Sequence, residues 1–109
     1  LAQKAALKRG VTNVRFVQGD SEKIATGLVR ERERFDRLLV DPPRTGAPGV
    51  GAWASGLLVQ RVVYVACDPA SLARDAAELH EHGFRPLALQ LFDLFPQTHH
   101  VEAVMAFSR

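Results

Sequence analysis

Short apolar runs alternate along this chain with longer segments whose apolar residues have helical spacing. The runs predict five strands, at residues 14–17, 38–40, 61–66, 87–92 and 101–107. The segments between them predict helices at residues 1–9, 21–32 and 69–81, and a weak helix that follows a glycine-rich loop and ends at residue 59. Strands that alternate with helices are typical of a parallel sheet, and continuous apolar strands indicate burial on both faces. The last two strands have no helix between them, which indicates one antiparallel member.

Residues at the expected helix ends support these boundaries. Asp68 is placed to cap the N-terminus of the last helix, and Pro69 suits the first turn of that helix. Gly83 lies beyond its end, and Gly10 closes the first helix in the same way. The pattern therefore predicts an α/β unit with a mostly parallel sheet.

The composition limits the size and the class of the protein. A chain of 109 residues with 47% hydrophobic and 24% charged residues is typical of a soluble globular protein of at most one domain. No apolar stretch approaches the roughly 20 residues that span a bilayer, so no membrane partner is expected. The chain starts at Leu1 within a helical pattern and without an initiator methionine, which predicts that residues 1–109 are a fragment lacking an N-terminal part.

Charge and cysteine content add two indications. A formal net charge of +2 and a pI of about 9.1 permit a polyanionic partner but do not require one. The single cysteine excludes an internal disulfide and suits a reducing compartment. The cytoplasm is therefore the expected location.

The single cysteine, Cys67, follows the strand at residues 61–66 and precedes the N-terminus of a helix. Ligands of open α/β sheets collect at the carboxyl ends of the strands, and a helix N-terminus favours the thiolate. Cys67 is thus a candidate nucleophile. The alternative is a small hydrophobic residue of the core, which is the more frequent role of a free cysteine.

A second candidate site follows the strand at residues 38–40. Asp41 stands there before Pro42 and Pro43, which stiffen the turn and remove two backbone donors. Arg44 comes next and is suited to clamp a phosphate or a carboxylate. The alternatives are an aspartate that caps its own turn and a solvated arginine.

Three segments of the chain together resemble a known family. They are DPPRTGAPGV at residues 41–50, VVYVACDPASLARD at residues 62–75 and DLFPQTHHVEAVMAFSR at residues 93–109. In this order and spacing they resemble the C-terminal motifs of the S-adenosylmethionine-dependent RNA 5-methyluridine methyltransferases, nearest to the branch that acts on large-subunit (23S) ribosomal RNA. The resemblance covers essentially the whole chain. It implies the C-terminal part of a Rossmann-like class I methyltransferase domain, without the first two strands of its sheet.

The resemblance also implies roles for individual residues. Cys67 matches the nucleophile that adds to carbon 6 of uracil, and Glu102 matches the base that later removes the hydrogen from carbon 5. Asp41 matches a contact to the methionine end of S-adenosylmethionine, and Arg44 would contact the RNA substrate. Asp20 matches a position close to the adenosine, with a helix cap as an equal alternative. The implied partner is RNA, 23S rRNA or else tRNA, and its target base must be flipped out of the stack to be reached.

This chain departs from the family pattern at two positions beside the cysteine. Ala66 stands where serine is frequent, and Asp68 stands where asparagine is usual. The charge of Asp68 disfavours a neighbouring thiolate and should slow its attack. The glycine-rich turn and the acidic residue that hold most of the cofactor in the family are also missing from residues 1–109, so the chain alone should bind cofactor weakly or not at all.

The predicted topology brings three of these residues to one edge of the sheet. In a methyltransferase-like sheet, which the resemblance implies, the strand before Asp41 neighbours the strand before Cys67, and the antiparallel last strand lies beside the latter. Glu102, at the start of that strand, then lies at the edge where the other two strands end. Neighbouring strands are about 4.8 Å apart, so the acid, the thiol and the base would all reach one flat base.

Several alternatives remain at this point. RNA cytosine-5 enzymes have a cysteine after the Asp-Pro-Pro turn and amino-methylating enzymes have an aromatic residue there, so Arg44 argues against both. A non-catalytic RNA-binding or structural remnant stays possible. His99 and His100 have no second ligand cluster, so no metal site is expected. Trp53 should pack in the core rather than stack on a base.

Two expectations concern local contacts. Arg74 and Asp75 are adjacent on a helix and should face different directions, so no direct pair is expected between them. The strand at residues 14–17 would pair, in the family order, with a strand that is missing here. We therefore expect that segment to be poorly docked, paired differently or completed by another chain.

Overall fold

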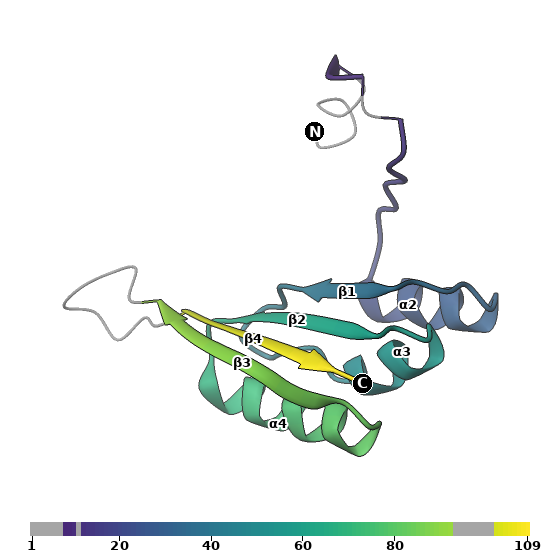
Figure 1. Ribbon diagram of the computed structural model, residues 1–109. Coiled ribbons are helices and arrows are strands. Elements are labelled where there is room, and N and C mark those ends of the chain that lie inside the picture. The colour runs from purple at the N-terminus through teal and green to yellow at the C-terminus, as the bar shows by residue number, and fades with distance from the viewer. Residues whose placement is uncertain (1–7, 11, 93–101) are drawn as a thin grey trace.

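The computed structural model of the chain describes residues 8–10, 12–92 and 102–109. The described residues form three helices and four strands, which alternate until the last two strands follow each other directly (Figure 1). Their bounds are α2 Ser21–Arg30, β1 Arg37–Val40, α3 Val50–Gly56, β2 Arg61–Ala66, α4 Pro69–Glu81, β3 Arg85–Phe92 and β4 Glu102–Ser108. The predicted α/β class is confirmed.

The four strands form one mixed sheet in the order β1-β2-β4-β3. β1 runs parallel to β2, with Val40 opposite Tyr64, and β4 runs antiparallel to both of its neighbours. β1, β2 and β3 therefore point the same way and β4 points back, as predicted for the last strand. The carboxyl ends of three strands and the beginning of β4 meet at one edge, which we call the site edge.

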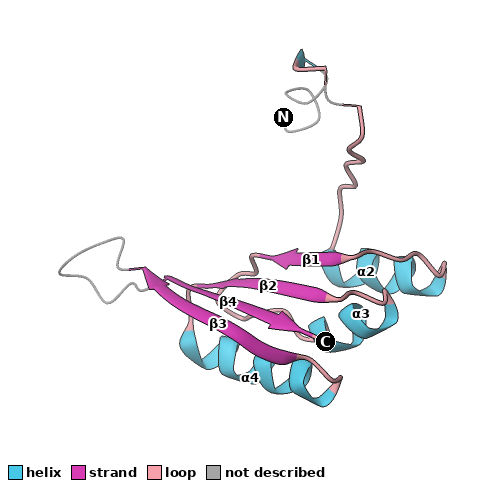
Figure 2. Cartoon of the chain, viewed as in Figure 1, coloured by secondary structure: helices cyan, strands magenta, loops and turns pink. Residues whose placement is uncertain are grey.

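All three helices pack on one face of this sheet (Figure 2). β2 alternates between exposed or half-buried and buried positions, and its buried residues Val62 and Tyr64 face the helices. They meet Leu79 of α4 and Phe107 of β4, which are also almost fully buried. The core thus lies between the sheet and the helices α3 and α4. Only two residues connect the end of β2 to the start of α4.

No described helix covers the opposite face of the sheet. Leu39 lies opposite Val63 in the register, so both face away from the helices. Leu39 is 70% exposed, and Val63 is half-buried. Sheets with parallel strands usually have both faces covered, so this apolar face is unusual for an α/β unit.

Most predicted boundaries hold within a few residues. β2 and α4 have the predicted limits, and the Asp68 carboxylate accepts a hydrogen bond from the Ser71 backbone amide at 3.2 Å, which makes it the expected N-cap. The weak third helix is confirmed at Val50–Gly56, three residues shorter at its end than expected. Residues 1–7 of the predicted first helix and residue 101 of the last strand lie outside the described residues.

The prediction of a strand at residues 14–17 is wrong. This segment forms no strand, and Val14, Phe16 and Val17 are 49%, 42% and 58% exposed. A strand needs a neighbour to accept and donate its backbone hydrogen bonds, and none of the described strands pairs with these residues. The segment leads away from the sheet (Figure 1), in agreement with the expectation that it is poorly docked.

None of the described helices combines the length and the apolar character that crossing a bilayer requires. The longest is α4, with 13 residues.

Candidate active site

Asp41, Cys67 and Glu102 all lie at the site edge. Asp41 directly follows β1 and Cys67 directly follows β2. Ala66 is opposite Ala103, so continuing the antiparallel register by one step places Cys67 beside Glu102. Cys67 and Glu102 are half-buried and Asp41 is exposed. The strand order therefore brings the acid, the thiol and the predicted base to the same edge.

A cavity of about 430 Å³ opens between the end of β1 and the start of α2. Its lining combines three carboxylates with apolar side chains and loop backbone: Asp20, Ser21, Glu22, Leu39, Val40, Asp41, Pro42, Pro43, Gly46, Ala47, Pro48 and Trp53. Cys67, Glu102 and Arg44 are not among these lining residues. Two of the five predicted site residues thus line the cavity, and two more lie at the edge of the sheet beyond it.

Asp20 caps a helix and also lines the cavity. Its side chain accepts a hydrogen bond of 2.9 Å from the backbone amide of Glu22 and caps α2. It also lines the cavity opposite Asp41. The helix cap is therefore confirmed, and the cap leaves the carboxylate at the cavity wall.

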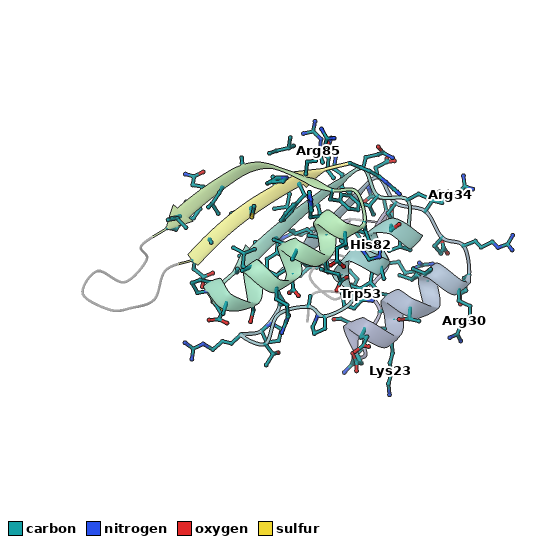
Figure 3. The ribbon with its side chains drawn as sticks, turned by 90° about the horizontal axis from the view of Figure 1, so that it is seen from below. Lys23, Arg30, Arg34, Trp53, His82 and Arg85 are labelled. Atoms are coloured by element: carbon teal, nitrogen blue, oxygen red, sulfur yellow. The ribbon has the colours of Figure 1, made fainter. Side chains whose placement is uncertain are left out.

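Trp53 is a core residue, as predicted. It is 9% exposed and belongs to the cluster of buried hydrophobic residues. In Figure 3, which looks at the helical face, Trp53 lies among the helices whereas Lys23 and Arg30 of α2 point outward. Trp53 also lines the cavity, so this core residue contributes apolar surface to it.

Residues 41–47, which we call the Asp41 loop, are bound by the first turns of α4. Three side chains of α4 each bind one backbone group of the loop: Ser71 Oγ donates to the Arg44 carbonyl, Arg74 Nη2 donates to the Thr45 carbonyl, and Asp75 Oδ2 accepts from the Ala47 amide at 2.7 Å. The Arg44 side chain itself is exposed. These contacts therefore hold the loop through its backbone groups and do not involve the loop side chains.

The prediction that Arg74 and Asp75 do not interact is wrong. Arg74 Nε lies 3.2 Å from Asp75 Oδ1. Neighbouring helical positions differ in direction at Cβ, but the long arginine side chain folds back across the loop. Arg74 is about half-exposed and Asp75 is 1% exposed, so the guanidinium covers a buried carboxylate.

Asp75 also binds the only tyrosine of the chain. The Tyr64 hydroxyl donates to Asp75 Oδ2 from the middle of β2. Burial, and then the hydrogen bond to Asp75, raise the pKa of the Tyr64 hydroxyl far above its ordinary value of 10.0. Tyr64 therefore stays protonated in the folded chain and continues to donate to Asp75.

This shift predicts how the chain responds to high pH. Tyr64 contributes stability that is fully present below pH 10.0 and is lost as the pH rises above it, because the unfolded chain releases its phenolic proton first. In the folded 109-residue chain, the near-ultraviolet absorbance of tyrosinate should stay absent above pH 10.0 and should appear only with unfolding. In an Asp75→Asn variant, the Tyr64 hydroxyl should ionise at a pH closer to 10.0. A folded wild-type chain whose tyrosinate titrates at 10.0 would contradict the account.

A second carboxylate of α4 fixes the start of α3. Glu78 accepts hydrogen bonds from the backbone amides of Gly49 at 2.8 Å, Gly51 and Ala52 at 3.1 Å. These amides have no partner within the helix, so Glu78 acts as a cap from another element. α3 and its Trp53 are thus held in place beside the cavity by α4.

The sequence interpretation missed these two acids, although one signal was present. Leu72, Asp75, Ala76 and Leu79 have the spacing of one helix face. An acid on an apolar face is an acid at a buried position, and buried acids need partners. Asp75 could have been identified in this way.

No group of three metal-binding side chains was found in the ranges that the structure describes. His99 and His100, the pair considered from sequence, lie outside those ranges, as does most of the segment between β3 and β4.

Comparison with known proteins decides the family. The family model described as tRNA (uracil-5-)-methyltransferase matches residues 1–109. The chain belongs to this family. The resemblance based on the three motifs is confirmed. One residue of each motif segment lies at the site edge: Asp41, Cys67 and Glu102.

Curated relatives point to ribosomal RNA enzymes within the tRNA (uracil-5-)-methyltransferase family. The 23S rRNA (uracil(1939)-C(5))-methyltransferase RlmD of Alkalilimnicola ehrlichii is 47% identical over 105 residues, which are 95% of this chain and 24% of that protein. The RlmD of Vibrio vulnificus strain YJ016 is 40% identical over 112 residues, which cover 100% of this chain and 26% of that protein. The chain thus spans about a quarter of the length of these relatives.

A solved structure supports the fold of this family member. The Pyrococcus abyssi tRNA (uracil-54, C5)-methyltransferase, in complex with S-adenosyl-L-homocysteine, superposes with a TM-score of 0.69 at 28% sequence identity. The match covers 97% of this chain and 24% of that protein. The mixed sheet described above is therefore part of a methyltransferase fold.

Proposed function

We propose that this chain is the C-terminal part of the catalytic domain of an S-adenosylmethionine-dependent enzyme that methylates carbon 5 of a uridine in 23S rRNA. Family membership and the names of the relatives at 40% and 47% identity support the reaction and the RNA class. The solved relative acts on tRNA by its name, so tRNA is the alternative substrate.

One observation carries the assignment of the reacting groups. The register of β2 and β4 sets Cys67 beside Glu102, while parallel β1 ends with Asp41 at the same edge. Strands that are distant in sequence and opposite in direction thereby bring a thiol, a carboxylate and a cavity together. A uracil-5 methyltransferase needs a nucleophile and a base at opposite ends of one carbon–carbon double bond, and this edge offers both.

The cavity suits one end of S-adenosylmethionine. Two of its three carboxylates, Asp20 and Asp41, complement the ammonium and sulfonium charges and the ribose hydroxyls, and Trp53 provides an apolar surface. Asp41 would hold the methionine end and Asp20 would lie nearer the adenosine. When bound, this cofactor supplies an electrophilic methyl group.

The residues of the chain perform the remaining steps. The Cys67 thiolate donates an electron pair to carbon 6 of uracil, and the electrons of the double bond move toward the carbonyl oxygen, which makes carbon 5 nucleophilic. After carbon 5 is methylated, Glu102 removes its hydrogen as a proton. The double bond re-forms, the sulfur leaves carbon 6 with its electron pair, and the thiolate is regenerated. Arg44, exposed on the fixed loop, is placed to contact an RNA phosphate.

The uncovered sheet face supports the proposal that the first strands of the sheet lie outside this chain. Leu39 is 70% exposed on the uncovered face of β1. β1 also has a single strand neighbour among the described residues. Further strands and helices of a longer protein would cover both features. We accordingly propose that the 109-residue segment alone binds cofactor weakly and does not methylate RNA.

The reaction is tested on the full-length protein that contains this segment. Purified protein, S-adenosylmethionine and unmodified 23S rRNA are incubated, and the RNA nucleosides are identified by mass spectrometry, with tRNA in a parallel reaction. The proposal predicts 5-methyluridine in the 23S rRNA. Methylation of cytidine, or of an exocyclic amine, would contradict it.

Asp41→Asn is expected to weaken the binding of S-adenosylhomocysteine by about 10- to 100-fold, because a charged hydrogen-bond partner is lost from the cavity wall. Calorimetry on the full-length protein measures the affinity. Asp36→Asn is the matched control, since Asp36 is an exposed acid at the opposite end of β1. Equal affinities for the wild type and Asp41→Asn would remove Asp41 from the cofactor site.

A further inference from the structure

We propose that Asp75 is a positioning residue for the site edge: through its hydrogen bonds it holds the Asp41 loop in a fixed place relative to Cys67. The inference rests on the proposed function, because it concerns the geometry of that same site. Asp75 touches none of the reacting groups. It acts through the loop backbone and through α4.

The first argument is that one helix face binds the whole loop. Ser71, Arg74 and Asp75 are spaced so that they share one face of α4, and each binds a different backbone group of the Asp41 loop. α4 begins at Pro69, two residues after Cys67. The same rigid element therefore follows the thiol and grips the loop that carries Asp41.

The second argument is that Asp75 is the centre of these contacts. It is 1% exposed, and its Oδ2 accepts from the Ala47 amide of the loop and from the Tyr64 hydroxyl of β2. Its Oδ1 receives Arg74 Nε. A buried carboxylate that loses these donors is costly, and so are the donors that lose the carboxylate. Asp75 thus ties the loop, α4 and β2 into one unit.

The third argument is that the loop has no space to shift toward the helix. Gly46 has a φ of +82°, and a Cβ placed on it would lie 2.6 Å from Asp75 Oδ2 and 3.1 Å from the Ser71 Cβ. Only a glycine permits this approach. The loop backbone therefore rests directly on the side chains that bind it, and movement of Asp75 is transmitted to the loop.

The loop forms a wall of the cavity, so its position matters for the reaction. Asp41, Pro42, Pro43, Gly46 and Ala47 all line that wall. A displacement of about 1 Å in a positioning element reduces rates by about 100-fold. Removing the Asp75 carboxylate should thus affect cofactor binding and turnover although Asp75 does not line the cavity.

The test uses Asp75→Ala and Asp75→Asn in the full-length protein. Asp75→Ala should lower kcat/KM by about 100-fold and weaken S-adenosylhomocysteine binding. Asp75→Asn should recover part of both, because its amide oxygen still accepts from the Ala47 amide. Leu79→Ala is the control for a destabilised helix: Leu79 is fully buried one turn later on α4, and its side chain has no group that can hydrogen-bond to the loop. At a temperature where it is folded, Leu79→Ala should keep kcat/KM within about three-fold of the wild type.

A second measurement does not depend on activity. Hydrogen exchange at the Ala47 amide, compared with amides inside α4, should be selectively faster in Asp75→Ala, whereas Leu79→Ala should accelerate both sets together. If Asp75→Ala does not fold, Ser71→Ala removes one loop contact and should show a smaller change of the same kind at the loop amides. Unchanged kcat/KM and unchanged Ala47 exchange would overturn the inference. A wild-type protein that does not methylate uridine overturns the proposed function instead, and the exchange data then decide whether Asp75 holds the loop.

Discussion

Replacing Cys67 by alanine in the full-length protein is expected to abolish the formation of 5-methyluridine, with a loss of roughly 10⁴-fold or more in kcat. Carbon 5 of uracil is a weak nucleophile, and no other thiol is present in residues 1–109 to activate it through carbon 6. Nucleoside mass spectrometry of the product RNA measures the effect.

The control for this substitution is the adjacent position. Ala66 is buried at the end of β2, and Ala66→Ser makes a small change directly beside the thiol. It should keep most of the activity, since its side chain faces the helices and not the thiol. A Cys67→Ala enzyme that still forms 5-methyluridine at a comparable rate would show that the thiol is a structural residue only.

Glu102→Gln should produce a different defect, in which the reaction stops after methylation. The thiol can still attack and carbon 5 can still be methylated, but no carboxylate removes the remaining hydrogen. We expect kcat to fall by about 10²- to 10⁴-fold, and a methylated RNA adduct should accumulate on Cys67. Intact-protein mass spectrometry after nuclease digestion measures that adduct.

Glu81→Gln is the matched control for Glu102→Gln. Glu81 is an exposed carboxylate at the end of α4, on the side of the sheet away from β1, and the substitution makes the same chemical change. It should turn over normally without an adduct. Loss of activity in Glu102→Gln without an accumulated adduct would assign Glu102 to a step before methylation and contradict its role as the base.

The sheet and its site edge were predictable from the sequence for a physical reason. Strands β1 and β2 are continuous apolar runs that end abruptly at Asp41 and Cys67, and the missing helix before β4 requires that this strand runs back. Together with the strand order that the family resemblance implies, these two facts place Glu102 beside Cys67. Site residues at strand ends depend on topology, and the order of the elements along the chain leaves part of that topology open, which the resemblance supplied.

Contacts between side chains and loop backbone were less accessible. The rule that adjacent helical residues diverge predicted no pair between Arg74 and Asp75, yet the guanidinium bends back over the carboxylate at 3.2 Å. The rule describes Cβ directions and does not account for a long flexible side chain. The hydrogen bond from the Ala47 amide to Asp75 joins positions 28 residues apart. A local sequence pattern does not predict a contact over that separation.

The failure at residues 14–17 has another cause. Alternation of apolar residues indicates a preference for extended backbone, but a strand exists only where a neighbour completes its hydrogen bonds. Val14, Phe16 and Val17 have the preference without the neighbour, and they are exposed. Local propensity therefore predicted a strand that has no partner.

The central claim is that Cys67 forms a covalent bond to carbon 6 of the target uracil. The most direct test incubates the full-length protein with S-adenosylmethionine and RNA that contains 5-fluorouracil. Fluorine at carbon 5 cannot be removed as a proton, so the adduct should persist as a protein–RNA species on a denaturing gel, with the RNA attached to the peptide that contains Cys67. The account predicts this adduct for the wild type and none for Cys67→Ala. Equal trapping by both proteins would contradict it.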